Sequence, residues 1–224
     1  MRARTAVTAA ALAASAALTL TACGGGGSGD GDKISAPPTV TGAAAPSASP
    51  TTAAPTGAAL RIDPSLALPA DLTLTFDWPL PPDHTKAVAL TAAANFIQAM
   101  NHAVVKQTTE DPGLTTYAAG DALAFGRSYV QQYVSHSWTL TGADRFYGPK
   151  VEISSDKASG QVTFCENQSK VYGKEVKTGK VLTTQESDNS YVSYEIVLAK
   201  LPTQTEVWQA QSITVKEKAS QCKQ

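Results

Sequence analysis

"HTKAVALTAAANFIQAMNHAVVK", residues 84–106, decides the fold, because it predicts one long helix with an apolar stripe. Its apolar side chains recur every three or four residues, the spacing that places them on one face of an α-helix. No Gly or Pro interrupts the stretch, and Asp83 or Thr85 can accept the free N–H groups of its first turn. We therefore expect the stripe to be buried against another element. Its members are Leu90, Ala94, Ile97, Met100 and Val104.

A second, shorter helix is predicted from Gly120 or Asp121 to Ser135, with Asp121 as its N-cap. "EDPG", residues 110–113, separates it from the first helix. Gly126 costs about 1 kcal/mol relative to Ala in a helix interior, so the apolar pattern has to outweigh it. The predicted inner face carries Ala122, Phe125, Tyr129, Gln132 and Tyr133.

After Trp138 the apolar residues recur at every second position, which indicates β-strands. "YVSYEIVLAKL", residues 191–201, is the clearest example. "DLTLTFDW", residues 71–78, predicts a short edge strand ahead of the helices, because prolines bound it. Further strands are predicted in "SWTLTG", "DRFYGPKVEIS", "SGQVTFCENQS" and "TEVWQAQSITVKEK"; in the last, Val207, Ile213 and Val215 oppose Trp208 and Ala210.

Helices followed by a run of strands predict an α+β domain, with the helices packed on one face of an antiparallel sheet. We place a single domain at residues 61–224, a length that suits one hydrophobic core. No internal repeat interrupts it.

The order and texture of these elements resemble the NTF2-like cone, also called the SnoaL-like fold. "AANFIQAMNHAV" followed by "TTYAAGDALAFGRSYVQQY" is similar to small actinobacterial lipoproteins that carry this fold behind a Pro/Thr/Ala linker. The resemblance covers about residues 85–216. It implies a strongly curved sheet that wraps the long helix, a cavity at the open end, and copies that can pair through the sheet as a homodimer.

Residues 1–22 are predicted to be an export signal, because Arg2 and Arg4 precede an uncharged apolar stretch. "LTAC", residues 20–23, resembles the bacterial lipobox. That resemblance implies cleavage before Cys23 and a diacylglycerol anchor with palmitate-type chains on its thiol, which places the protein on the outer face of the cell membrane. The alternatives are an ordinary secretory signal with a chance cysteine, or an N-terminal anchor helix.

Residues 23–60 are predicted to be a disordered linker, Gly-rich at first and then rich in Pro, Ala, Ser and Thr. Such a composition buries too little apolar surface to offset the entropy of ordering. As a flexible coil, about 40 residues would have a root-mean-square end-to-end distance of roughly 35 Å, which the prolines would lengthen. Its Ser and Thr residues are also candidates for O-glycosylation.

Cys165 and Cys222 remain once Cys23 is assigned to the anchor, and we predict a disulfide between them, since disulfides persist outside the cytoplasm. A metal site and a catalytic thiol are the alternatives. The three histidines all lie well upstream, so neither alternative has a partner at a suitable spacing.

The remaining sequence excludes several classes of partner and motif but assigns no specific function. Without Arg2 and Arg4 the 18 basic residues become 16 against 19 acidic ones, so no basic stripe in the sequence suggests nucleic acid or an anionic lipid surface as a partner. "GKEVKTGK" lacks the spacing of a phosphate-binding loop and is interpreted as a surface hairpin.

We name no catalytic residue, metal or cofactor. The leading hypothesis is a non-catalytic binding or interaction module with an unknown protein or small-molecule partner.

An enzyme acting on a small apolar molecule in the cavity is the alternative, and a domain that only docks a partner protein at the membrane is a third. The resemblance implies that such enzymes set a carboxylate or histidine against tyrosines inside the cone. Asp121 is expected to be only a cap and Asp144 only part of an exposed turn. The cavity candidates are His102, Tyr129, Tyr133 and Tyr194.

Overall fold

The computed structural model describes residues 60–202 and 204–224. The predicted signal, Cys23 and nearly all of the predicted linker lie outside the described residues, so those hypotheses stay predictions. The helices are α1 (His84–Lys106), α2 (Pro112–Tyr117) and α3 (Gly120–Ser135). The strands are β1 (Leu72–Asp77), β2 (Trp138–Ile153), β3 (Ser159–Glu175), β4 (Val181–Leu182), β5 (Tyr191–Leu201) and β6 (Gln204–Lys216).

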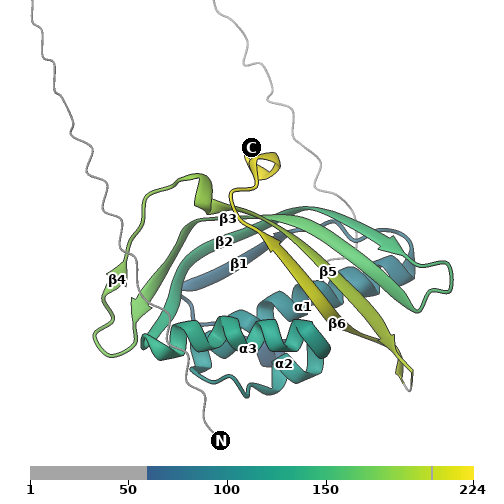
Figure 1. Cartoon of the computed structure of the whole chain (residues 1–224), viewed down its shortest axis with the longest axis horizontal. Helices are drawn as coiled ribbons and strands as arrows, with labels where there is room; N and C mark the ends of the chain where they lie inside the picture. The colour runs from purple at the N-terminus through teal and green to yellow at the C-terminus, as the bar shows by residue number, and fades with distance from the viewer. Residues whose placement is uncertain (1–59, 203) are drawn as a thin grey trace, which may run out of the picture. The chain divides into compact units, whose positions relative to one another are not determined.

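The domain has the predicted α+β architecture, with three helices packed against one face of a curved sheet (Figure 1). The strand order is β1-β2-β3-β5-β6, and β4 pairs with β3. One detail of the prediction is wrong: the sheet is not entirely antiparallel, since β1 runs parallel to β2. Parallel strands need a long crossover connection, and the three helices that lie between β1 and β2 in sequence provide it.

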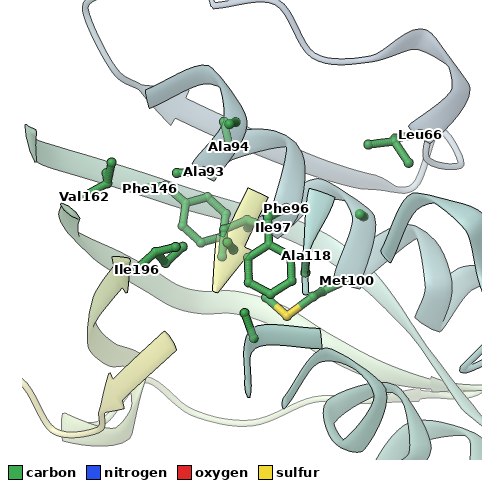
Figure 2. Close-up of a cluster of buried hydrophobic side chains, with 14 of the residues drawn as sticks. Leu66, Ala93, Ala94, Phe96, Ile97, Met100, Ala118, Phe146, Val162 and Ile196 are labelled. Carbon is green, nitrogen blue, oxygen red and sulfur yellow. The ribbon is translucent and has the colours of Figure 1, made fainter. Parts of the chain in front are cut away.

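Helix α1 lies in the concave side of the sheet, where its apolar stripe fills the core. Phe96, Ile97 and Met100 face Phe146, Val162 and Ile196 of the strands (Figure 2). Among the described residues, α1 is the one helix long and apolar enough to cross a membrane, but 83% of that window is buried inside the domain. Its apolarity is therefore explained by its place in the core.

The predicted N-cap is correct for α1 and wrong for α3. Asp83 caps α1, accepting a hydrogen bond from the Lys86 amide at 2.9 Å. The N-cap of α3 is Ala119, not Asp121, which lies in the first turn. The Ala119 amide donates to the Ala210 carbonyl of β6 at 2.8 Å, so a backbone bridge to the sheet positions the start of α3 and no side chain caps it.

Bulges change which side chains face the core. The β5–β6 pairing shifts between Val197↔Ser212 and Leu198↔Ala210, which leaves Gln211 as an extra residue in β6. Ile213 consequently packs on the same core as Trp208, and the prediction that the two oppose each other is wrong. A bulge reverses the alternation of every residue beyond it.

The chain end is tied to the convex face of the sheet, opposite the helices (Figure 1). A disulfide joins Cys165 of β3 to Cys222, as the sequence predicts. The Tyr147 hydroxyl donates to the Cys222 carbonyl, and the Gln221 amide donates to Ser193 Oγ at 3.2 Å. Tyr147, Ala219 and Cys222 form a small second core on the outside of the sheet, and Cys165 and Tyr191 pack against it.

Candidate functional site

A cluster of buried acidic and phenolic side chains lies inside the curve of the sheet. Asp144 of β2 is 5% exposed and Glu166 of β3 is 6% exposed. Tyr194 of β5 donates its hydroxyl hydrogen bond to Glu166 Oε2 at 2.9 Å. Polar groups are rarely buried without a compensating interaction, so this cluster is the first candidate for function.

The sheet brings the two carboxyl groups together through a bulge. The β2–β3 register shifts between Ala143↔Lys170 and Arg145↔Asn167, so two residues of β3 oppose Asp144 alone. The prediction that Asp144 belongs to an exposed turn is therefore wrong: it lies in the middle of a long strand, on its inner face. A bulge re-aims side chains locally, and here it turns the Asp144 side chain toward Glu166.

Three of the four predicted cavity candidates meet at this cluster. Tyr129 and Tyr133 lie one turn apart on α3, with ring centroids 5.1 Å apart. Tyr194 stacks on Phe164 at 5.0 Å and closes the group from the sheet side. Burial raises the pKa of all three phenols, and the nearby Glu166 charge raises each of them further.

The carboxyl pair retains a proton above the pH at which free carboxylic acids lose theirs. Burial raises the pKa of Asp144 well above its ordinary value, and the Glu166 charge and hydrogen bond raise it further. Burial also raises the pKa of Glu166, but hydrogen bonds from Asp144 and Tyr194 oppose that effect. The two carboxyl groups therefore titrate as a pair that shares one proton.

The space beside the pair is too small for an organic ligand. It measures about 20 Å³ and is enclosed by Met100, Asn101, Phe125 and Tyr129 of the helices. A volume of this size matches about one water molecule, whereas ligand pockets usually measure several hundred Å³. The interior cluster can hold and share a proton, but a substrate could not reach it in this conformation.

The fourth candidate, His102, belongs elsewhere. Its Nδ1 atom lies 3.0 Å from Asp111 Oδ2, and both side chains are almost fully buried. Asp111 also caps α2, accepting a hydrogen bond from the Gly113 amide at 2.8 Å. The pair joins the end of α1 to the start of α2, so the prediction that His102 lines the cavity with the tyrosines is wrong.

A much larger concavity opens between the first half of α1, the end of α2 and the start of β6. It measures about 680 Å³, within the usual range of ligand pockets. Most of its surface is apolar, and Arg61 and His84 lie at its margin. The apolar side chains come from Leu80, Ala87, Val88, Ala92, Val207 and Trp208. We call this concavity the α1–β6 groove.

One wall of the α1–β6 groove is fixed by hydrogen bonds to the first described residues. The Asp63 amide donates to Asn95 Oδ1 at 2.8 Å, and the Tyr117 hydroxyl donates to Asp63 Oδ2 at 2.7 Å. The Tyr117 bond holds the pKa of Asp63 below its ordinary value. The groove is thus a built feature of the domain, and it lies where the predicted linker joins it.

A somewhat smaller depression of about 550 Å³ lies on the convex face beside the disulfide. Its lining mixes charged and hydroxyl side chains, including Lys150, Glu195 and Lys216, so it offers less apolar surface than the α1–β6 groove. Within residues 60–202 and 204–224, no group of three His, Cys, Asp or Glu side chains is placed to hold a metal ion.

Glu166, Asp111 and the groove were not predicted from the sequence. Glu166 continues the alternation of Val162 and Phe164 along β3, so its position on the buried face could have been found from the pattern. Asp111 has no such signal, because its contact with His102 depends on the sharp return of the chain after α1. The groove joins segments that are distant in sequence.

Comparison with known proteins gives a likeness of fold. No family model matches the chain, and no curated protein matches it. Among solved structures, the chain is similar to the intermembrane space region of chloroplast protein ARC6, with 10% identity, a TM-score of 0.42, and coverage of 61% of this chain and 99% of that one.

Two further similar structures carry the NTF2-like name. One is a candidate dehydratase from Streptomyces avermitilis, with 13% identity, a TM-score of 0.40, and coverage of 61% of this chain and 98% of that one. The other is an NTF2-like superfamily protein from Salmonella enterica serovar Typhimurium, with 10% identity, a TM-score of 0.39, and coverage of 59% and 92%. Likenesses at this level concern the course of the chain and say nothing of ligand or activity.

Proposed function

We propose that this chain is a membrane-tethered extracytoplasmic binding module whose α1–β6 groove takes a small apolar molecule. The observation that carries the proposal is the contrast in volume: about 680 Å³ in the apolar groove against about 20 Å³ beside the buried carboxyl pair. An apolar concavity with a few polar groups at its margin suits a ligand that is mostly hydrocarbon. Arg61 at the rim offers a cation to its polar or anionic end.

The tether is proposed from the sequence around Cys23. A lipobox cysteine followed by a long Gly- and Pro-rich stretch favours a domain held near the outer membrane surface. Cys23→Ser is expected to abolish acylation, which can be followed by metabolic labelling with a palmitate analogue and by the mass of the membrane-extracted protein. Retention of the label in the variant would show that Cys23 is not the acylated residue.

The groove is tested with 1-anilinonaphthalene-8-sulfonate, an apolar fluorescent anion, and the chain of residues 24–224. We expect saturable binding to the wild type and about tenfold weaker binding to Ala87→Trp, because the indole would occupy the groove and a tenfold loss corresponds to about 1.4 kcal/mol. Ala143→Trp, on an exposed part of β2, is the matched control. Equal binding by both Trp variants, or none by the wild type, would refute the groove.

An enzyme is the second candidate, and the buried Asp144–Glu166 pair is the observation that favours it. A carboxyl group whose pKa is raised by burial can serve as a general acid beside a phenol. The same fluorescence titration separates the two candidates. Asp144→Asn should leave the probe's affinity unchanged if the ligand lies in the groove, and should change it if the ligand enters the cone.

A further inference from the structure

The two large apolar side chains that stand out as exposed in the described residues lie on one hairpin. Val176 is 50% exposed and Val181 is 40% exposed. Both belong to residues 174–181, which connect β3 to β4 and which we call the basic hairpin. Single exposed apolar residues are ordinary, but two that flank the same turn form a local apolar tip. Figure 1 shows β4 and this turn at the end of the sheet where β2 begins.

The basic hairpin holds its tip in a defined shape. The Glu175 amide donates to the Lys180 carbonyl at 2.9 Å, and the Gly179 amide donates to the Glu175 carbonyl at 2.9 Å. Thr178 Oγ1 donates to Glu175 Oε2 at 2.6 Å. The Val176 amide donates to the Ser137 carbonyl, which fixes the hairpin to the start of β2. The exposure of the valines therefore belongs to a fixed turn.

Positive charge surrounds this tip although the whole chain is slightly acidic. Lys177 and Lys180 are exposed on the hairpin itself, and Lys170 is exposed further along β3. Lys174 is paired with Asp71 at 2.5 Å, so it adds little free charge. Lys106 is exposed at the end of α1, next to Gln107, whose amide bonds to the Trp138 carbonyl at 2.7 Å. Glu175 is the one acidic residue of the basic hairpin. The two charges of Lys177 and Lys180 therefore exceed its single negative charge.

An aromatic pair lies beside the hairpin. Trp138 is opposite Glu175 in the β2–β3 register and stacks on the ring of His136 at 4.7 Å. Trp138 is only partly buried and His136 is exposed. Partly exposed Trp residues are enriched where proteins meet the boundary between lipid headgroups and acyl chains.

We propose that the basic hairpin is a contact site for an anionic lipid surface. Val176 and Val181 enter the headgroup boundary, while Lys177 and Lys180 approach the lipid phosphates; lysines near such a surface each add to binding, and apolar side chains add further. A bilayer is favoured over an acidic protein because the proposed tether on Cys23 would hold the domain at a root-mean-square distance of roughly 35 Å from one. The inference rests on the proposed function only for that proximity.

The test uses the chain of residues 24–224, which lacks the acylated cysteine. Both buried clusters lie wholly within residues 60–224, so this chain retains its core. Sedimentation with phosphatidylcholine vesicles is compared with vesicles that contain one third phosphatidylglycerol, at low salt and at 0.5 M NaCl. We expect preferential binding to the anionic vesicles that is lost at high salt, because salt screens surface charge.

Three variants locate the contact. Lys177→Glu with Lys180→Glu should weaken partitioning at least tenfold, since each lysine near an anionic surface contributes about fivefold. Val176→Ser with Val181→Ser should weaken it about threefold or more. Lys150→Glu with Lys157→Glu makes the same charge change at the far end of the β2–β3 hairpin and should have little effect.

Four outcomes would overturn the proposal. They are no preference of the wild type for anionic vesicles, an equal loss in the Lys150/Lys157 control, no effect of the valine substitutions, or binding to soluble poly-glutamate in place of vesicles. None of them bears on acylation of Cys23, because the tested chain lacks that residue. Failure of the hairpin contact and failure of the tether are thus told apart.

Discussion

Replacing both Cys165 and Cys222 with Ala is expected to lower the free energy of unfolding by about 4 kcal/mol. The bridge closes a loop of 57 residues, and a cross-link of that span restricts the unfolded chain by roughly that amount in the chain-entropy model. The loop contains most of β3, all of β5 and all of β6. The loss should therefore be felt by the whole sheet, and urea unfolding of the 24–224 chain measures it.

Two controls separate the covalent bond from the contacts around it. Tyr147→Phe removes only the hydroxyl that donates to the Cys222 carbonyl, and should cost about 1 kcal/mol. A reducing agent should destabilise the wild type as much as the double substitution does, and should leave the double variant unchanged. A loss below about 1 kcal/mol in the double variant would mean that packing of the chain end, and not the bond, stabilises the convex face.

The domain is expected to be more stable in mild acid than at alkaline pH because of the Asp144–Glu166 pair. The pKa of Asp144 in the folded state is raised above its unfolded value near 4 by burial and by the Glu166 charge. The stability from the protonated pair is fully present below the unfolded pKa and is lost as the pH rises through the folded pKa. With both groups ionised in a dry site, the cost is on the order of 3 kcal/mol.

Acid lowers stability through other carboxylates. Hydrogen bonds from Tyr117 and Lys174 lower the pKa values of Asp63 and Asp71, so their contribution is present above the unfolded pKa and is lost as the pH falls below it. Stability should consequently peak between the unfolded pKa of these carboxyl groups, near 4, and the folded pKa of Asp144, and should decline on both sides. Denaturant unfolding from pH 4 to pH 9 would show that maximum.

Asp144→Asn isolates the contribution of the pair. The amide is neutral at every pH and can still donate to Glu166, so the variant should lack the alkaline decline and exceed the wild type there by about 3 kcal/mol. Near pH 5 the two should agree within about 1 kcal/mol. Asp121→Asn removes an exposed carboxylate from the first turn of α3 and should keep the wild-type slope. An unchanged slope in Asp144→Asn would refute the shared proton.

The secondary structure was largely predictable because most elements carry a local signal. The stripe from Leu90 to Val104 predicts α1, and the alternation in residues 191–201 predicts β5. Errors arose where a non-local contact decides the outcome. The bulge at Gln211 turned Ile213 inward, and the bridge from Ala119 to Ala210 made a side-chain cap at Asp121 unnecessary.

The candidate site was predictable only in part for the same reason. Tyr129 and Tyr133 share a helix face, and Tyr194 lies on the inner side of β5, so local periodicity could select all three. Burial of Asp144 depends on the register between β2 and β3, which a single strand does not encode. The turn between α1 and α2 brings His102 next to Asp111, and the periodicity of α1 does not predict this contact.

The sequence by itself determined the order of helix and strand and the pairing of Cys165 with Cys222. It also predicts an export signal with a lipid anchor at Cys23. Each of these depends on spacing or composition within one stretch of chain. Only the tertiary structure decided which carboxyl groups are buried, how small the interior space is, and where the large groove opens. Burial and volume depend on side chains from separate elements that meet only when the sheet curves around α1, and the same curvature brings α1, α2 and β6 together at the groove.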